Sequence, residues 1–341
     1  MLAAYEPEQR FVIESSEPIV EIYRDCVYVP VIEPANYWEN KDWGIYDRDG
    51  KLIEAAAFYR VGKREGQSDV CPLDLSRAPY APRQRYFYVG NVFNHYGHFL
   101  CSTMSRLWAL PRYREGSMPL LGHAVGGPPH WFSWSHTRTL FGAAGINYED
   151  FANFDRPTRI RELVVARPSF VECTHAHTTH AHAAHRWGDR LAKTQDVTSP
   201  IDMIYLAKTK FRDLPHGMAN EARLVEALQH LGVQIVHPEQ LTIPEQVALF
   251  RRTRIVMGQV GSALHTNIFN EPRYDQVFVA FNASPHTYSS NHAMFDAINN
   301  NRSFYVYTPC EWKNYDDGVA RYELNDPQAA AREIVDFARS V

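Results

Sequence analysis

The chain has 341 residues, of which 45% are hydrophobic, 13% aromatic and 22% charged. This balance excludes a disordered, collagen-like or coiled-coil chain and fits a globular protein of one large domain or two compact ones. Lys and Arg number 35 against 39 Asp and Glu, a formal charge of −4, so the basic excess that drives nucleic-acid binding is lacking.

The five cysteines are an odd number, lie far apart and form no CxxC, which argues against a disulfide framework or a zinc ribbon. No stretch approaches the roughly 18–20 apolar residues of a membrane span, and the N-terminal MLAAYEPEQR lacks the features of a signal peptide. We therefore expect a cytoplasmic protein, free or peripheral at the inner face of the membrane, and leave a homodimer open.

The first predicted element is a β-hairpin within residues Trp43–Arg60. The pair Asp49-Gly50 lies between two alternating segments, which is a strong hairpin signal. Asp47 and Asp49 also form an Asp-x-Asp, a pattern that can hold a metal-bound nucleotide. We favour the turn, because Asp and Gly supply what its backbone requires.

The next elements form a strand followed by a helix. Tyr86–Phe93 is apolar and aromatic and predicts a strand. Gly97–Leu110 places apolar residues at helical spacing, and we expect Pro111 to end that helix. Weaker patterns predict a strand near 119–124, a helix near 131–144 and a strand near 162–166.

From about residue 200 the pattern becomes regular and predicts a parallel, doubly wound α/β sheet. The strands are expected at 201–207, 233–236, 254–258, 276–281 and 303–307, and the helices at 220–231, 244–252, 262–270 and 290–299. A capping box at Thr242 begins one helix, and Asp326 caps the last helix, which runs to Arg339. The change of rhythm places a domain boundary near residues 195–200.

A glycine turn between a strand and a helix is the most informative candidate site. Residues 254–258 are expected to lead through Gly261 into a helix that starts with Ser262 and Ala263. The free N–H groups and the positive dipole end of such a helix suit a phosphate. The alternative is a tight turn without a ligand; His265, one turn on, is either an anion donor or a packed histidine.

Polar side chains gather at a second strand-to-helix turn. Asn94, His95, Tyr96 and His98 follow the strand at 86–93, where an open α/β sheet places its ligands. The two histidines, three residues apart, could act as a general base and as a hydrogen-bond donor to a sugar. The alternative is that they are helix-capping residues.

Cations gather at the carboxyl end of the strand 201–207. Lys208, Lys210 and Arg212 lie within the five residues that follow it, and they either bind phosphate or form a solvated surface cluster. Asn220 and Glu221 begin the next helix, where Glu221 could hold a ribose or favour the helix dipole.

Five histidines occur in the eleven residues His175–His185. A metal would need three or four of them to converge, and no carboxylate is interleaved, so His177, His180 and His182 are weak metal candidates. We favour a polar surface loop, with a histidine-lined loop over the active cleft as its rival.

Taken together, these segments resemble glycosyltransferase family 61, whose bacterial members serve in capsular polysaccharide biosynthesis. Asn94–Leu100 with Arg106-Leu107-Trp108 is similar to the family's "N-Y-G-H-F … R-L-W" block. The later blocks around Lys208, Asn220-Glu221, Glu245-Gln246 and Gly261–His265 follow in the family's order. The resemblance covers about residues 85–270.

The resemblance implies two facing Rossmann-like domains of the GT-B type. Residues 1–197 would form the acceptor-side domain and 198–325 the nucleotide-sugar-binding domain. The helix in 326–341 would be a separate element, for which packing on the N-terminal domain is one arrangement. The activity implied is inverting, metal-independent transfer from a nucleotide sugar, often UDP-linked, with no further cofactor. The acceptor would be a glycan or a lipid-linked oligosaccharide.

The residue roles follow from that chemistry. Fixed dipoles and cations are expected to stabilise the negative charge of the departing diphosphate. His98 or His95 is expected to act as the base that removes the proton of the acceptor hydroxyl. We expect the acceptor or cleft side to include Asn94, Tyr96, Arg106 and Glu245. The donor site would comprise Gly261, Ser262, Ala263, His265, Lys208, Arg212, Asn220 and Glu221.

Two alternatives remain open at this point. A non-catalytic sugar- or nucleotide-binding partner in polysaccharide assembly would bind the donor without turnover. A metal-dependent hydrolase using His175–His185 would contain stoichiometric metal and be sensitive to chelators.

Overall fold

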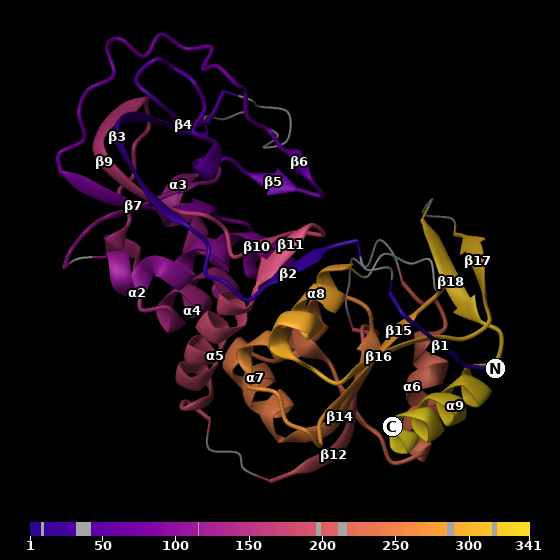
Figure 1. Ribbon diagram of the computed structural model, residues 1–341. Coiled ribbons are helices and arrows are strands. Elements are labelled where there is room, and N and C mark those ends of the chain that lie inside the picture. The colour runs from indigo at the N-terminus through magenta and orange to yellow at the C-terminus, as the bar shows by residue number, and fades with distance from the viewer. Residues whose placement is uncertain are drawn as a thin grey trace. The chain divides into compact units, whose positions relative to one another are not determined.

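The structure, a computed structural model, describes residues 1–7, 10–31, 42–114, 116–195, 199–210, 217–284, 290–315 and 319–341 (Figure 1). The chain forms two compact units, Arg10–Ala183 and Ala184–Val341, and the second unit also includes Met1–Gln9. The division falls inside α5 (Thr178–Ala192) rather than at residue 197. The sequence pattern placed it later because the regular strand–helix alternation begins only after α5.

A five-stranded mixed sheet forms the centre of the first unit. Its strands follow the order β4 (Gly44–Tyr46), β3 (Val20–Val29), β9 (Thr158–Ala166), β7 (Arg85–Asn91) and β8 (Leu120–His123). β9, β7 and β8 are parallel, whereas β3 runs antiparallel to both β4 and β9. The predicted strands at 86–93, 119–124 and 162–166 are therefore confirmed, and β3 was missed.

The predicted helix after β7 is present but irregular. It comprises α1 (Tyr96–His98), a π-helical turn η2 (Phe99–Thr103), a 3₁₀ segment η3 (Met104–Ala109) and α2 (Leu110–Tyr113). Pro111 does not end it, because this proline lies in the first turn of α2, where a missing N–H costs nothing. The predicted helix at 131–144 is divided into α3 (Gly127–Trp131) and α4 (Ser135–Ala143).

The turn predicted at Asp47–Gly50 is confirmed. The Oδ1 atom of Asp47 accepts hydrogen bonds from the backbone N–H groups of Asp49 (2.9 Å) and Lys51 (2.8 Å). Tyr46 and Leu52 form an antiparallel bridge across the turn. The Asp47 carboxylate thus stabilises the turn itself.

The second unit contains a six-stranded sheet. Its order is β1 (Ala3–Tyr5), β16 (Ser303–Tyr307), β15 (Val277–Asn282), β14 (Thr253–Gln259), β12 (Ile201–Leu206) and β13 (Gln234–Val236). The last five strands are parallel, and β1 pairs antiparallel with β16. The strands predicted after residue 200 are confirmed, and so is the mixed α/β class.

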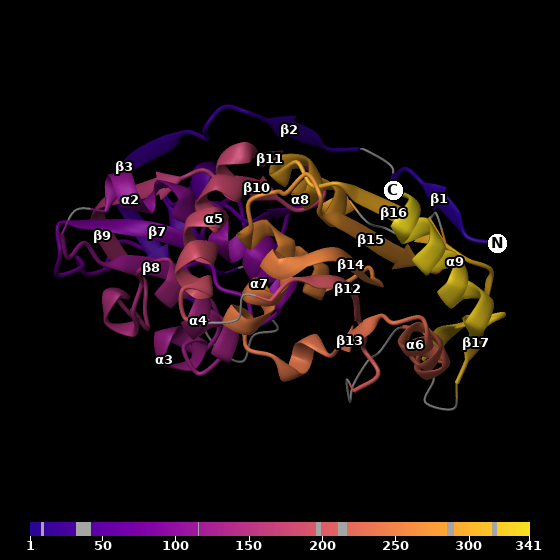
Figure 2. The same ribbon diagram turned by 90° about the horizontal axis from the view of Figure 1, so that it is seen from below.

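Helices cover both faces of this sheet (Figure 2). α6 (Glu221–His230) and α9 (Pro327–Ser340) share one apolar core with alternate residues of the strands, including Met203, Ile255 and Val279. α7 (Ile243–Arg252), η6 (Ser262–Phe269) and α8 (Ser290–Asn299) lie on the other face. The capping box at Thr242 and the cap at Asp326 are confirmed. α9 packs within this unit because its buried stripe meets α6 and the sheet.

The parallel strands have the spatial order 2-1-3-4-5 when numbered from β12. In sheets of this order, ligands bind outside the carboxyl ends of the strands, where the order reverses. Here that point lies between β12 and β14. The order therefore directs attention to the residues that follow these two strands.

The remaining strands form small sheets, one of which joins segments far apart in the sequence. β2 (Val12–Glu14) pairs in parallel with β11 (His175–His177), which also pairs with β10 (Phe170–Val171). A separate hairpin joins β17 (Cys310–Asn314) to β18 (Ala320–Leu324). The remaining elements are η1 (Glu54–Ala56), β5 (Tyr59–Arg60), β6 (Lys63–Arg64), η4 (Tyr148–Asp150) and η5 (Pro238–Gln240).

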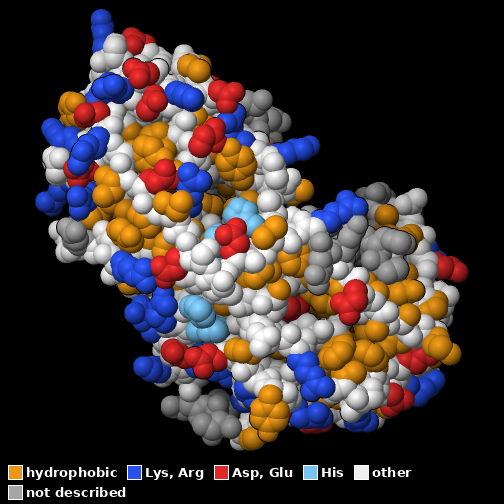
Figure 3. All heavy atoms as spheres, in the orientation of Figure 1, with side chains coloured by type: hydrophobic (Ala, Val, Ile, Leu, Met, Phe, Trp, Pro, Cys, Tyr) orange, Lys and Arg blue, Asp and Glu red, His pale blue; other side chains and the backbone are white. Residues whose placement is uncertain are grey.

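The surface mixes charges of both signs. On the face shown in Figure 3, basic and acidic side chains are interspersed on each unit, in keeping with the formal charge of −4. Among the helices of the described ranges, none is long and apolar enough to cross a membrane.

Candidate functional site

Lys208 and Gly261 meet at the point where the strand order reverses. Lys208 follows β12, and its Nζ atom donates to the carbonyl of Val260, directly after β14, at 3.2 Å. A Cβ atom on Gly261 would lie 2.8 Å from Nζ and 3.3 Å from Cε of Lys208, so a larger residue would displace the lysine. Burial lowers the pKa of Lys208, and the charge of Glu221 opposes that shift.

Glu221 is engaged by groups of the protein. Its carboxylate, only 4% exposed, accepts hydrogen bonds from the backbone N–H of Lys208 (3.1 and 3.2 Å). Tyr205 Oη (3.1 Å) and Gln259 Nε2 (2.7 Å) also donate to it. Burial raises the pKa of Glu221 and these donors oppose the rise. This geometry suits the joining of β12 to β14 better than the binding of a ribose.

Gln259 and Tyr322 support this network and were missed in the sequence. Gln259 ends β14, and its Oε1 atom accepts from Tyr322 Oη of β18 at 2.9 Å. A polar residue at the end of an apolar strand was the available signal. Asn220 is joined to β18 in a similar way, because its amide donates to the carbonyl and accepts from the N–H of Leu324 at 2.9 and 3.0 Å.

The segment after Gly261 is a 3₁₀ helix, η6, and not the expected α-helix. Ser262 and Ala263 at its start are partly exposed, and N–H groups at a helix start carry a partial positive charge. No side chain caps this start. Phosphate binding at this turn therefore stays a prediction, and its backbone N–H groups are not used by a side-chain cap. Arg212 lies outside the described residues.

His265 is packed inside the unit. It is 6% exposed, and its ring stacks on His292 at 4.1 Å and lies 4.7 Å from Phe295. The space that these residues line holds only about 10 Å³, less than a ligand group requires. Burial, with the charge of Lys208, lowers the pKa of His292 to about 3. These contacts favour the packed-histidine alternative for His265.

In the first unit, His98 contacts a buried carboxylate. Its Nδ1 atom lies 2.9 Å from Oε1 of Glu172. Ser102 Oγ donates to the same oxygen at 3.0 Å, and Arg60 Nε donates to Oε2 at 3.1 Å. Glu172 is 1% exposed. Burial alone would raise its pKa, but the contacts with His98, Arg60 and Ser102 lower the pKa of Glu172 below its ordinary value.

The other polar residues of this turn surround His98. His95 caps α1, since its Nδ1 atom accepts from the N–H of His98 at 3.4 Å, and the two rings lie 4.8 Å apart. Burial, followed by the charge of His98, lowers the pKa of His95. Asn94 is exposed, and Tyr96 is half-buried with its ring 6.5 Å from that of His136. The structure thus gives His95 the capping role that was the alternative, without removing it from the neighbourhood of His98.

Arg106 does not line an open cleft. It is 4% exposed and donates to the carbonyls of Ala55 (2.7 Å), Ala57 (3.1 Å) and Ala166. Burial lowers its pKa to about 10. The guanidinium joins the η1 region to the end of β9, so we correct the expected acceptor role to a structural one.

The histidines of 175–185 do not form the expected surface loop, because they lie in β11 and α5. His177 and His180 are buried, with Nδ1 contacts to the carbonyl of Ser16 (2.7 Å) and to Ser169 Oγ (2.9 Å). His182 is exposed. Burial lowers the pKa of His180 to about 3. Across the described ranges, no three His, Cys, Asp or Glu side chains are grouped to hold a metal.

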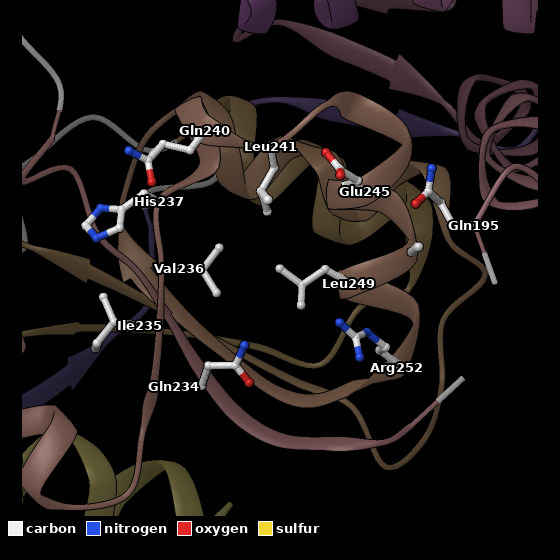
Figure 4. A pocket seen from close by; sticks show the side chains of 11 residues that line it. Gln195, Gln234, Ile235, Val236, His237, Gln240, Leu241, Glu245, Leu249 and Arg252 are labelled. Atoms are coloured by element: carbon white, nitrogen blue, oxygen red, sulfur yellow. The ribbon is translucent and has the colours of Figure 1, made fainter. Parts of the chain in front are cut away.

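Glu245 lines a pocket of about 390 Å³ between β13 and α7 (Figure 4). Val236, Leu241 and Leu249 point into it, and polar side chains such as Gln234 and Arg252 surround them. The Glu245 carboxylate accepts from the N–H (2.7 Å) and the hydroxyl (2.8 Å) of Thr242. Neither Lys208 nor Gly261 lines this pocket, so it is separate from the site at the strand ends.

One candidate site places a cation beside a glycine turn in the second unit, and the other places an imidazole against a carboxylate in the first unit. A family model for glycosyltransferase 61 matches residues 96–277, more than half of the chain. The protein is therefore a glycosyltransferase and belongs to glycosyltransferase family 61. Comparison with curated proteins finds no match. The matched range includes His98, Glu172 and Lys208.

Proposed function

We propose that the protein is an inverting glycosyltransferase that moves a sugar from a nucleoside-diphosphate donor to a glycan or lipid-linked oligosaccharide. We favour a UDP-sugar as the donor. We further propose that this reaction serves surface or capsular polysaccharide synthesis. The observation that carries the proposal is the juxtaposition of Lys208 with the Gly261 turn, inside the range that matches the family. A cation and free N–H groups at a strand-order reversal are suited to a diphosphate.

The two units take the two roles of a GT-B glycosyltransferase in this proposal. The unit of Ala184–Val341 binds the donor, and the unit of Arg10–Ala183 supplies the base. Support for the first role is the parallel sheet with helices on both faces. The second role rests on His98 and its buried carboxylate partner.

On the donor side, Lys208 and the N–H groups of Ser262 and Ala263 stabilise the departing diphosphate without a metal. Negative charge grows on the leaving oxygen as the glycosidic bond breaks, and preorganised donors reduce the barrier most when they lie in partly desolvated surroundings. Lys208 is half-buried, and Glu221 and Val260 hold its backbone and its ammonium. On the acceptor side, His98 removes the proton of the attacking hydroxyl.

The test is nucleotide binding and sugar transfer in the presence of a chelator. UDP at about 100 times its Kd is expected to add about 2.7 kcal/mol of stability, a shift of a few degrees in Tm. Other nucleoside diphosphates and NAD serve as comparisons. Transfer from the corresponding sugar nucleotide must follow; binding without turnover would instead identify a non-catalytic binding protein.

Replacement of Lys208 by Met should weaken nucleoside-diphosphate binding by about 10- to 150-fold. A charge-assisted hydrogen bond contributes about 1.5–3 kcal/mol, which converts to that ratio of Kd. Lys210→Met is the matched control, since Lys210 is exposed and its ammonium lies at the edge of hydrogen-bond distance, 3.5 Å, from Gln240 Oε1. Equal Kd values for the two variants, measured by titration calorimetry, would remove Lys208 from the donor site.

A further inference from the structure

Glu172 is a buried carboxylate, and its partners His98, Ser102 and Arg60 come from different parts of the first unit. His98 belongs to α1, Ser102 to the π-helical turn and Arg60 to β5, and Glu172 itself directly follows β10. A carboxylate that is 1% exposed is costly to desolvate unless charged or polar groups satisfy it. Here Arg60 donates to Oε2 of Glu172 and Ser102 donates to Oε1. The Nδ1 atom of His98 also contacts Oε1.

These contacts determine which nitrogen of His98 carries the proton. An ionised carboxylate can only accept hydrogen bonds. Arg60 Nε and Ser102 Oγ both donate to the Glu172 carboxylate, as they would to an ionised acceptor, so the Nδ1 atom of His98, 2.9 Å away, is the donor in this contact. In the neutral imidazole the lone pair then lies on Nε2.

We propose that Glu172 is a positioning residue that holds His98 in the Nδ1–H tautomer, so that Nε2 is the atom that takes the proton of the acceptor hydroxyl. This inference rests on the proposed function. As the acceptor oxygen bonds to the anomeric carbon, the bond from that carbon to the diphosphate oxygen breaks, and its electron pair leaves with the diphosphate. The hydroxyl proton passes to Nε2, and the Glu172 carboxylate stabilises the imidazolium that forms.

The surroundings of His98 support this direction of proton transfer. Titratable groups that interact with the pair include Arg60, His95 and Cys101, and His136 lies beside His95; burial lowers the pKa values of both histidines and raises that of Cys101. Glu172 is the carboxylate that contacts His98 directly. Arg60 donates to the other oxygen of Glu172, and a cation at that position favours the ionised carboxylate.

A double-mutant cycle tests the proposal through activity. Glu172→Gln keeps the size of the side chain but removes its charge, and its amide no longer requires a donor on Nδ1. We expect kcat to fall by at least about 10-fold, but by less than in His98→Ala, with little change in donor KM. In the His98→Ala background, Glu172→Gln should cause no further loss, because Glu172 acts through His98.

A matched control separates positioning from structural support. Glu162 is also ion-paired in the first unit, with Arg85 at 2.9 Å and Arg24 at 3.5 Å, and it is paired on β9 with Arg85 of β7. Glu162→Gln should leave kcat unchanged. Additive losses for Glu172→Gln and His98→Ala, or an equal loss in Glu162→Gln, would overturn the proposal.

A second measurement needs no turnover. Nitrogen-15 spectra of histidine-labelled protein, with the His98 signals assigned from their loss in His98→Ala, report the tautomer directly. We expect Nδ1–H in the wild type and loss of that preference in Glu172→Gln. A wild-type Nε2–H tautomer, or the same tautomer in both proteins, would refute positioning by Glu172. Absence of any sugar transfer with the expected spectra would instead refute the proposed function alone.

Discussion

Replacement of His98 by Ala is expected to lower kcat for sugar transfer by about 10²- to 10⁴-fold, the usual contribution of a general base. Donor binding should be unchanged, since the residues proposed to bind the diphosphate belong to the other unit. The imidazole is 27% exposed and hydrogen-bonded through Nδ1, which leaves its second nitrogen for chemistry. Steady-state kinetics together with nucleotide titration would measure the two effects separately.

Two histidine variants serve as comparisons for this prediction. His130→Ala removes an exposed histidine of the same unit, whose ring packs on Trp134, and should leave kcat intact. His95→Ala removes the cap of α1 and a ring close to His98, so a smaller loss is expected. Weakened nucleotide binding with normal turnover in His98→Ala would contradict its assignment as the base.

Replacement of Gly188 by Ala should destabilise the second unit by about 3 kcal/mol or more, at the upper end of overpacking effects. A Cβ atom on this residue of α5 would lie 1.8 Å from the carbonyl oxygen of Phe269 and 2.7 Å from its carbon. Both atoms are backbone, so the helix or η6 has to move. Two further contacts hold α5 against neighbouring helices of the second unit. Asp189 pairs with Arg251 of α7 at 2.9 Å, and His185 contacts Asn299 of α8 at 2.5 Å.

Gly142→Ala provides the matched control for this substitution. Gly142 is an exposed residue of α4, and a Cβ atom there would meet nothing within 4 Å. Because Ala is the better helix former, a gain of about 0.5–1 kcal/mol is expected. Urea unfolding followed by a probe in each unit would compare the two; a Gly188→Ala protein as stable as the wild type would mean that α5 and η6 can separate at little cost.

The second unit could be predicted from its sequence because its information is local. Apolar strands, amphipathic helices and the caps at Thr242 and Asp326 each lie within a few residues of the element they define. The same logic located Lys208 and Gly261, since each follows a strand directly. The 3₁₀ form of η6 and the burial of His265 depend on packing against α8 and had no local signal.

The first unit shows what local patterns leave out. Glu172 lies 74 residues from His98 in the sequence, and no motif joins them. The histidine run was predicted to be a loop, although Ala181, Ala184 and Trp187 lie at helical spacing and are buried in α5. Arg106 fitted the family block well, but its three carbonyl partners come from two distant segments. In each case the sequence shows the chemical type of the side chain but does not show which distant residue it contacts in the fold.

The pairing of β1 with β16 has a consequence for biosynthesis. Ala3 lies opposite Tyr307, so the unit of Arg10–Ala183 is an insertion between the first strand of the other unit and the rest of it. At the usual ribosomal rate of about 5–20 residues per second, the first strand waits roughly 15–60 seconds for its partner to be synthesised. The inserted unit can fold as it emerges, whereas β1 can pair only after β16, which ends at Tyr307, has left the ribosome.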